Sequence, residues 1–269
     1  MIDTLTAAAI EAGKAILDVY ERDISVAEKA DCSPVTEADR SAEEIILAIL
    51  AQTFPDIPVV AEESVAAGAV PDIDGQRFFL VDPLDGTKEF INRRSDFTVN
   101  IALISDGEPV AGVVFAPARQ VGYVAEGGKA TKFHVAADFA VTEIAEIRCR
   151  PRPASLTAVA SRSHSDAETA DFLQKNAILE CTSIGSSLKF CLLAEGLADV
   201  YPRFGRTMEW DTAAGDAVLR AAGGRVTTLD GQPFLYGKRR QANDCDFANP
   251  GFIGWGRDCG PLATEKEAE

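Results

Sequence analysis

Apolar positions in the first fifth of the chain repeat at helical spacing. From about residue 3 to residue 20 they lie on one face of a helix whose first turn Asp3 or Thr4 can cap. Pro34 interrupts this pattern, and a second helix is predicted from about Thr36 to Phe54. Its apolar stripe consists of Ile45, Ile46, Ile49 and Leu50.

The pattern then changes to short apolar runs, which are typical of strands. Pro58–Ala61 is the first, residues 65–76 form a predicted loop rich in Ala, Gly, Asp and Pro, and Arg77–Val81 is a strand that ends at Asp82. Further strands are predicted at Phe97–Ile104, Val110–Phe115, Val121–Ala125 and Lys132–Val135, the first two joined by a hairpin turn at Asp106-Gly107.

A Pro- and Arg-rich stretch at Arg148–Pro153 marks a predicted domain boundary. Beyond it strands alternate with helices, which favours an α/β arrangement. We therefore expect an α+β domain over residues 1–150 and an α/β domain over residues 151–269. The expected elements are strands at Leu156–Ala160, Ile178–Thr182, Ala198–Tyr201 and Arg225–Thr227, and helices at Asp166–Asn176, Ser186–Glu195 and Asp211–Ala222.

Composition excludes some classes of function. Hydrophobic residues make up 46% and charged residues 25% of the 269 positions, which are ordinary globular values. The net charge of −16 argues against a general nucleic-acid coat and against electrostatic docking on anionic lipid. An anionic substrate is still compatible with this charge, provided that a few basic side chains, a helix N-terminus or a bound metal meets it locally.

The cysteines and histidines give no zinc pattern. The six cysteines contain no C-x-x-C pair, and only His134 and His164 could add imidazole ligands. We find no basic leader followed by an apolar core, and no apolar run of about 18 residues that could span a membrane. Scattered cysteines without an export signal favour a reducing cytoplasm.

The most informative stretch is the sequence VDPLDGT at positions 81–87. A strand delivers Asp82, Pro83 stiffens the turn, and Asp85 follows three residues later. Gly86 allows close backbone approach, and the amides at a helix start near Thr87 can bind a phosphate. Two carboxylates beside an anion repel it unless cations lie between them, and Mg²⁺ binds through carboxylates together with substrate phosphate.

Two further acidic elements stand at comparable places in the pattern. AEES at 61–64 ends a short apolar strand, and Asp211 opens a helix of small residues. These three elements could form one multi-metal pocket. From the residues alone the alternative stays open that Asp82 and Asp85 only cap a turn, because Asp, Pro and Gly are common turn residues.

Together, AEES at 61–64, DPLDGT at 82–87 and WDTAAGDA at 210–217 resemble, in order and rough spacing, the inositol monophosphatase superfamily of Mg²⁺-dependent, lithium-sensitive phosphatases. The similarity extends from the first helix to about Pro250. It implies an α/β fold with an α+β first half, in the layered αβαβα arrangement of the sugar phosphatases.

The resemblance also implies metal ligands. Glu62, Asp82 and the Leu84 carbonyl would hold a first Mg²⁺, and Asp82, Asp85 and Asp211 would hold a second. A third, weaker ion would lie near Glu62. One metal would lower the pKa of the attacking water while the other stabilises the leaving alkoxide.

The same resemblance implies a catalytic group formed by Thr87, Asp39 and Glu62. The amides of Gly86 and Thr87 would hold the scissile phosphate. The Thr87 hydroxyl, hydrogen-bonded to Asp39, would help to activate a water. Read from the sequence alone, Asp39 could equally be an acid at a helix start, and Glu63 a residue that only supports the metal site.

Three segments of the second half resemble the bacterial CysQ type of 3'(2'),5'-bisphosphate nucleotidase: GSSLKFC at 185–191, AEGLAD at 194–199 and YPRFG at 201–205. Lys189 and Arg203 are cations suited to a second substrate phosphate, although Lys189 could be a solvated helix residue. Ser186 could add a contact, and His164 could line a nucleoside pocket or lie in a surface loop. The expected substrate contacts are Glu62, Leu84, Asp85, Gly86, Thr87, His164, Ser186, Lys189, Arg203 and Asp211.

The resemblance implies hydrolysis of the 3'-phosphate of adenosine 3',5'-bisphosphate, with 3'-phosphoadenylyl sulfate as a second substrate. The alternatives are an inositol-1-phosphatase, another sugar or histidinol phosphatase, and a non-catalytic nucleotide sensor. The expected partner is a small phosphate ester, with no nucleic acid. The sequence leaves open whether the protein is a monomer or a homodimer, and whether a cytoplasmic protein of this kind also associates with the inner face of the membrane.

Overall fold

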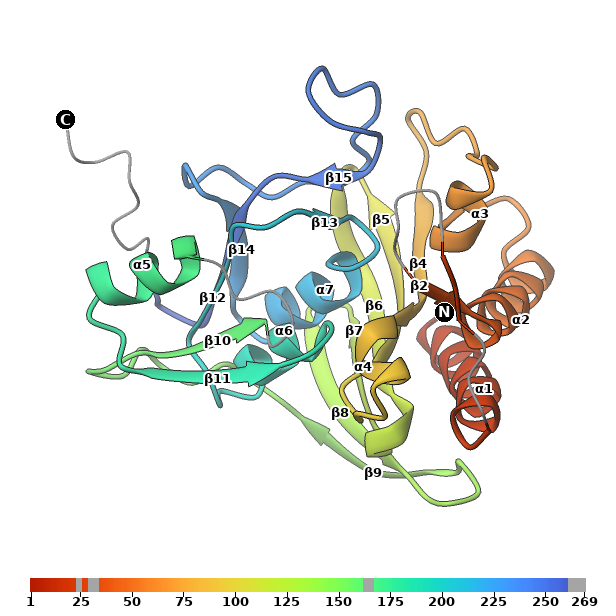
Figure 1. Ribbon diagram of the computed structural model, residues 1–269, viewed down its shortest axis with the longest axis horizontal. Helices are drawn as coiled ribbons and strands as arrows, with labels where there is room; N and C mark the ends of the chain where they lie inside the picture. Colours follow the sequence, from red (N-terminus) through yellow and green to blue (C-terminus); the bar gives the residue numbers. More distant parts are fainter. Residues whose placement is uncertain (23–25, 29–33, 162–166, 261–269) are drawn as a thin grey trace.

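Helices and sheets alternate in five layers in the computed structural model, which describes residues 1–22, 26–28, 34–161 and 167–260 (Figure 1). The first layer contains α1 (Ile2–Tyr20) and α2 (Glu37–Thr53), and a seven-stranded sheet follows. Helices α6 (Leu188–Ala194) and α7 (Ala213–Ala221) separate it from a five-stranded sheet, and α5 (Ala167–Lys175) covers the far side. The predicted αβαβα arrangement is confirmed.

The seven-stranded sheet has the order β3-β4-β5-β6-β7-β8-β9. Strands β3 and β4 are parallel, and every later neighbouring pair is antiparallel. The strands are β3 (Val59–Ala61), β4 (Phe78–Asp85), β5 (Thr98–Ser105), β6 (Glu108–Ala116), β7 (Val121–Glu126), β8 (Lys129–Val135) and β9 (Val141–Glu146).

The five-stranded sheet has the order β11-β10-β12-β16-β14. Its strands are β10 (Thr157–Ser161), β11 (Glu180–Ile184), β12 (Val200–Arg203), β14 (Arg225–Thr228) and β16 (Phe252–Trp255). The remaining elements are small: two strand pairs, β1 (Val26–Glu28) with β2 (Pro34–Thr36) and β13 (Thr207–Met208) with β15 (Ala248–Asn249), and the short helices α3 (Glu62–Ala66), α4 (Thr87–Ile91) and a 3-10 turn at Pro117–Arg119.

Three hydrophobic clusters fill the spaces between the layers, and the largest of them extends from one sheet past α6 and α7 to the other. Leu5, Ile46 and Phe79 belong to the cluster beneath α1 and α2. Phe190 and Val218 belong to the cluster between the two sheets. A smaller cluster beneath α5 contains Phe172, Val200 and Trp255. Together these clusters hold the two sheets and three helical layers in a fixed order.

The central strands are buried on both faces, and this explains their unbroken apolar sequences. In β4, Phe79 and Val81 face the cluster beneath α1 and α2, whereas Phe78 and Leu80 face the cluster between the sheets. Successive side chains of a strand point to opposite faces, so a strand between two helical layers needs apolar residues at every position.

Several predicted boundaries differ from the structure. Strand β4 continues through Asp82 to Asp85, where a tight turn was expected, and β11 begins two residues after the predicted start at Ile178. Residues 62–66 are helical, although part of this segment was expected to be loop. Strands β9 and β16 were not predicted, because their short runs give little periodic signal. None of the described helices combines the length and apolar character needed to cross a membrane.

The change from one sheet to the other falls between Glu146 and Thr157, the ends of β9 and β10. Helix α7, from the later part of the chain, nevertheless packs on β6 of the first sheet. The two-domain division at residue 150 stays a prediction.

Gly112 allows α7 to approach β6 closely. A Cβ atom at this position would lie 2.8 Å from the Ala217 Cβ and 3.1 Å from the Ala214 carbonyl oxygen. The backbone of α7 would therefore have to move away from the sheet, and the turn that precedes α7 would move with it.

We expect Gly112→Ala to lower the free energy of unfolding by about 1–3 kcal/mol, the usual cost of overpacking a core. Urea unfolding followed by circular dichroism measures this change. Gly260→Ala is the matched control, because its Cβ would meet its nearest atom only at 4.0 Å. Equal stability of the two variants would show that α7 moves without cost.

Candidate active site

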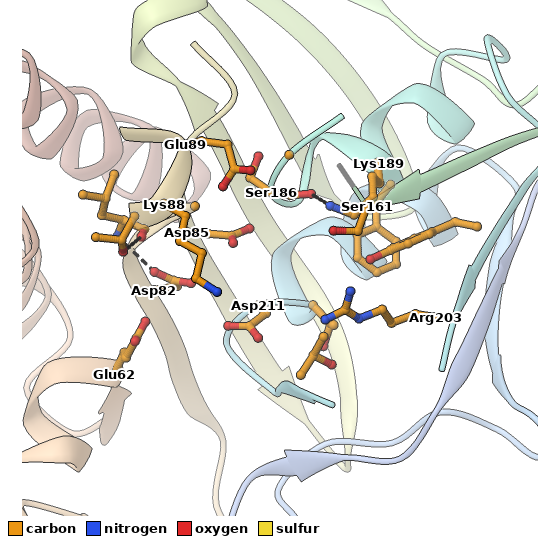
Figure 2. A pocket seen from close by; sticks show the side chains of 18 residues that line it. Glu62, Asp82, Asp85, Lys88, Glu89, Ser161, Ser186, Lys189, Arg203 and Asp211 are labelled. Carbon is orange, nitrogen blue, oxygen red and sulfur yellow. Dashed lines mark hydrogen bonds between the residues drawn. The ribbon is translucent and has the colours of Figure 1, made fainter. Parts of the chain in front are cut away.

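A cavity of about 260 Å³ opens where β4 ends and where the segments before α6 and α7 face it (Figure 2). Acidic side chains gather on the side of β4, and the cations Lys189 and Arg203 lie across the cavity from them. The lining residues are Glu62, Asp82, Leu84, Asp85, Gly86, Thr87, Lys88, Glu89, Ser161, Gly185, Ser186, Lys189, Phe190, Tyr201, Arg203, Thr207, Asp211 and Thr212.

Strand pairing places Glu62 beside Asp82. In the parallel pair β3–β4, Ala61 stands opposite Val81, so the next residue of each strand is an acid at the same edge of the sheet. Glu62 begins α3 immediately after β3, whereas Asp82 continues in β4 and is buried. Two acids that are 20 positions apart in the sequence thus meet through backbone register.

An irregularity in β4 brings Asp85 to the same cavity. Asp82 stands opposite Asn100 of β5 and Asp85 opposite Thr98, so β4 contains one more residue than β5 in this interval. Pro83 has no backbone N–H to donate, and the Leu84 amide donates to Asp82 Oδ1 at 3.0 Å. This bulge turns both aspartates of the DPLD sequence toward the cavity.

Asp211 lies in the turn before α7. The predicted helix over Asp211–Ala222 therefore starts too early, because the first helical residue is Ala213. The Met208 amide donates to Asp211 Oδ2 at 2.8 Å, and the Ser187 hydroxyl donates to the Asp211 carbonyl at 2.6 Å. These bonds hold the aspartate in the turn and direct its carboxylate into the cavity.

Ser187 also binds Asp85 and so connects the two acids. Its amide donates to Asp85 Oδ2 at 2.6 Å, and Asn100 Nδ2 donates to the same oxygen at 3.3 Å. Ser187 is buried and does not line the cavity. It lies beside the predicted Ser186, and only the tertiary structure distinguishes the roles of the two serines.

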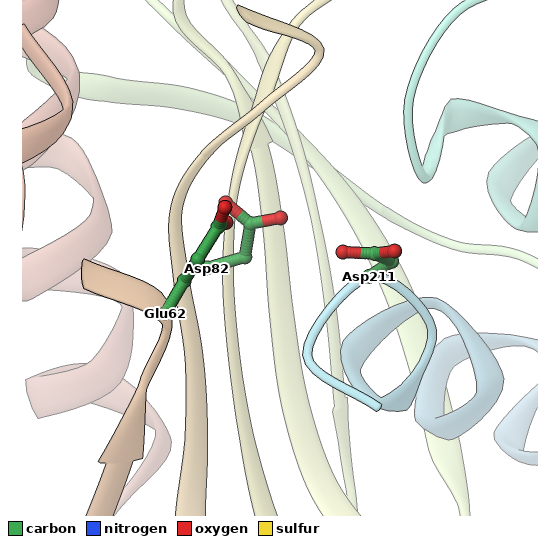
Figure 3. A group of neighbouring side chains, drawn as sticks. All are labelled: Glu62, Asp82 and Asp211. Atoms are coloured by element: carbon green, nitrogen blue, oxygen red, sulfur yellow. The ribbon is translucent and has the colours of Figure 1, made fainter. Parts of the chain in front are cut away.

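Glu62, Asp82 and Asp211 bring one carboxylate oxygen each to within 4.8 Å of the others (Figure 3). The pKa of Asp211 is raised to about 8, mainly by burial and further by the negative charges of Asp85 and Glu62. Burial also raises the pKa of Asp85, against the attraction of Lys189. The acids thus destabilise one another's charged forms.

A divalent cation fits this set of donors. Hard cations such as Mg²⁺ prefer carboxylate oxygens, and a cation among these side chains would stabilise the charged forms that burial disfavours. The Leu84 carbonyl, which also lines the cavity, is a further oxygen of the same class. Carboxylates contributed by β4, by the start of α3 and by the turn before α7 therefore form a suitable metal site.

Thr87 and Asp39 are joined as expected. Thr87 Oγ1 lies 3.1 Å from Asp39 Oδ1 and 3.2 Å from the Leu84 carbonyl oxygen. Asp39 Oδ2 accepts bonds from the Thr36 amide and hydroxyl, both at 2.7 Å, in a capping box at the start of α2. Asp39 is thus both an acid at a helix start and a partner of Thr87, and it lies behind the cavity, where it is buried.

Gly86 is the residue that the turn before α4 requires. Its φ angle is +95°, and a Cβ atom would lie 3.1 Å from the Asp96 carbonyl oxygen. Both conditions disfavour any other residue, because a side chain is strained at this φ and crowded by backbone. Gly86 thereby sets the direction in which Thr87 leaves β4.

The two cations are held by different contacts. Lys189 is buried, its ammonium donates to the Ser186 carbonyl at 2.5 Å, and burial lowers its pKa to about 8 although Asp85 counteracts this. Arg203 donates to the Gly205 carbonyl at 3.0 Å and to the Arg206 carbonyl at 3.1 Å. Lys189 is therefore a buried residue of the site. The alternative interpretation from the sequence, that it is a solvated helix residue, is wrong.

All but two of the predicted site residues line the cavity. Asp39 supports it from behind, and His164 lies outside the described residues. Lys88, Glu89, Tyr201 and Thr207 line it without having been predicted as site residues. For Lys88 and Glu89 the available signal was their place directly after DPLDGT, and Figure 2 shows Lys88 extending toward Asp82 and Asp211.

Comparison with known proteins agrees with this geometry. The sequence model of the inositol monophosphatase family matches residues 1–248. The chain belongs to the inositol monophosphatase family. The resemblance inferred from the three acidic motifs is thereby confirmed.

Similar curated proteins carry a more specific name. The chain is 48% identical over 254 residues to the 3'(2'),5'-bisphosphate nucleotidase CysQ of Shigella flexneri, covering 94% of this chain and 98% of that one. The CysQ of Escherichia coli K12 gives the same identity and coverage. Among solved structures, CysQ from Bacteroides thetaiotaomicron is 42% identical with a TM-score of 0.78, covering 94% of this chain and 96% of that chain.

Divalent-cation binding is expected to release protons at neutral pH. With its pKa raised to about 8, Asp211 is protonated at pH 7 in the cation-free protein, and a cation requires the carboxylate. Affinity for Mg²⁺ should therefore rise with pH up to about 8, by up to about tenfold per pH unit for each proton released. Calorimetric titration in two buffers of different ionisation enthalpy measures this release.

Asp85→Asn provides the comparison for this titration. Removing the Asp85 charge lowers the pKa of Asp211, so the variant should release fewer protons on binding. It should also bind Mg²⁺ more weakly, because one proposed ligand loses its charge. The cation-free variant should keep the circular dichroism spectrum of the wild type, because Asn has the same shape and keeps an oxygen that can accept from the Ser187 amide. Cation binding at pH 7 without proton release by the wild type would contradict the raised pKa of Asp211.

Proposed function

We propose that this chain is a Mg²⁺-dependent phosphatase that hydrolyses the 3'-phosphate of adenosine 3',5'-bisphosphate to AMP and phosphate. We propose 3'-phosphoadenylyl sulfate as a second substrate. The observation that carries the proposal is the composition of a single cavity, which combines the acids Glu62, Asp82, Asp85, Glu89 and Asp211 with the cations Lys189 and Arg203. The high identity to proteins named 3'(2'),5'-bisphosphate nucleotidase supports the same substrate class.

Two Mg²⁺ ions are proposed, as the sequence analysis expects. Glu62, Asp82 and the Leu84 carbonyl would hold one, and Asp82, Asp85 and Asp211 the other, with a third, weaker ion near Glu62. When bound, Mg²⁺ supplies Lewis acidity, which lowers the pKa of a water and stabilises the negative charge of the phosphate and the leaving oxygen.

Thr87 and Asp39 are proposed to orient the attacking water. A hydroxyl donates one hydrogen, and the Asp39 carboxylate, which is held by the helix cap, receives it from Thr87. The lone pairs of Thr87 Oγ1 are then directed to accept a hydrogen from a water in the cavity. Phosphoryl transfer depends mainly on such positioning and on charge neutralisation, so no histidine or cysteine nucleophile is needed.

The side of the cavity that carries Lys189 and Arg203 is proposed to bind the second phosphate of the substrate. Arg203 and Lys189 provide charged donors for a second phosphate, and Ser186 adds a polar group beside them. The guanidinium of Arg203 is already oriented by two backbone carbonyls, so less side-chain freedom is lost on binding. We propose that the amides of Gly86 and Thr87 bind the scissile phosphate. His164, which lies outside the described residues, is still proposed as a contact of the nucleoside.

We propose the cytoplasm as the compartment. The five cysteines that the structure describes are all free thiols, including the exposed Cys181 and Cys245. A reducing compartment maintains that state.

Phosphate release from a substrate panel tests the proposal. We expect kcat/KM for adenosine 3',5'-bisphosphate to exceed the values for inositol 1-phosphate and fructose 1,6-bisphosphate by at least about tenfold, the effect of one charge-assisted hydrogen bond. A tenfold preference for inositol phosphate would instead indicate an inositol phosphatase. Tight nucleotide binding without Mg²⁺-dependent turnover would indicate a sensor.

Arg203→Ala tests the reading of the second phosphate. We expect kcat/KM for adenosine 3',5'-bisphosphate to fall by about 10–100-fold, with a much smaller loss on a monophosphate ester, because only the former loses a charge-assisted contact. Arg206→Ala is the control, since Arg206 is three residues away, exposed and outside the cavity. Equal losses of kcat/KM on both substrates would show that Arg203 does not bind the second phosphate.

A further inference from the structure

Glu43 is a buried acid of α2 whose carboxylate binds a different helix. It is 5% exposed and does not line the cavity. Its Oε2 accepts from the Glu63 amide at 2.8 Å, and its Oε1 accepts from the Ser64 amide at 2.8 Å and the Ser64 hydroxyl at 2.6 Å. All three bonds go to the first turn of α3, which begins with Glu62.

This turn has no cap of its own. The N-cap residue of α3 is Ala61, whose methyl group cannot accept the amide hydrogens that the first turn of a helix leaves unpaired. Glu43 supplies both acceptors from α2 instead. A five-residue helix has little intrinsic stability, so its position depends on such external contacts.

Glu43 and Asp39 stand four residues apart on α2 and therefore face the same way. Asp39 binds Thr87, and Glu43 binds the residues directly after Glu62. One face of α2 thus sets the relative positions of two parts of the cavity, the start of α4 and the start of α3.

We infer that Glu43 is a positioning residue for metal binding: by capping α3 it holds the Glu62 carboxylate toward Asp82. This inference rests on the proposed role of Glu62 as a metal ligand. Residues that orient ligands from behind commonly contribute about 10–100-fold to metal affinity. Glu43 exerts this effect through the backbone of the ligand's own helix.

The test is Mn²⁺ binding to the purified full chain, counted by electron paramagnetic resonance of the free ion. Mn²⁺ is a suitable probe because it prefers the same oxygen ligands as Mg²⁺. In Glu43→Gln one oxygen becomes an amide donor that opposes a backbone N–H. We expect a rise of about tenfold in the Kd of one class of Mn²⁺ site.

Glu44→Gln is the matched control, because Glu44 is the next residue of α2, carries the same charge and is exposed. It should bind Mn²⁺ with wild-type affinity. Ser64→Ala removes only the hydroxyl bond to Glu43 and should change the Kd by less than about threefold, because both amide bonds remain.

Glu43→Asp keeps the charge but withdraws it by one methylene, so it should also weaken Mn²⁺ binding. It replaces Glu43→Gln as the deciding variant if the latter does not fold. A lower unfolding temperature with wild-type Mn²⁺ affinity, in whichever of the two variants folds, would overturn the inference and leave Glu43 a purely structural residue. Failure of the wild type itself to bind Mn²⁺ would instead overturn the proposed function.

Discussion

The burial of several carboxylates in one place is the constraint on which this structure depends. Burial raises the pKa values of Asp85 and Asp211, and the charges of Asp85 and Glu62 add to the effect at Asp211. A protein that had only to be stable would not gather acids in this way. The rest of the fold must therefore supply enough stability, and enough backbone rigidity, to hold these groups together until a cation removes the repulsion.

The layered architecture supplies that rigidity because each acid comes from an element anchored in a different part of the core. Glu62 and Asp82 are neighbours through the register of β3 and β4, and Asp85 follows from a bulge in β4. Asp211 reaches the same cavity because α7 packs closely on the other face of the sheet, at Gly112. Buried polar groups such as Ser187 and Glu43 then fix the turns that carry the acids. The acidic cluster thus lies at a sheet that is covered on both faces, so the elements that carry the acids cannot shift independently.

The overall charge of −16 takes on a different meaning once the site is known. Part of the excess lies in the cavity, where the carboxylates are suited to bind cations. A bound cation would allow a negatively charged protein to accept a negatively charged substrate. The basic groups that face the cavity are few, and Lys189 and Arg203 are both oriented by backbone carbonyls. Under the proposed function, recognition of an anion would depend on a small number of placed charges and on bound metal, with no need for a generally basic surface.

The sequence by itself determined the helices with clear periodicity, the apolar central strands, and the acids of the DPLDGT, AEES and WDTAAGDA segments, because local hydrophobic pattern and residue chemistry are written in consecutive positions. It missed the edge strand β9 and misplaced the starts of β11 and α7, where short segments carry little periodic signal. Only the tertiary structure decided that Asp39 lies behind Thr87, that Lys189 is buried beside Asp85, and that Ser187 and Glu43 hold the acidic turns. These contacts join residues from different elements. The elements are brought together by strand register, by the bulge in β4 and by close helix packing, which are properties of the folded chain.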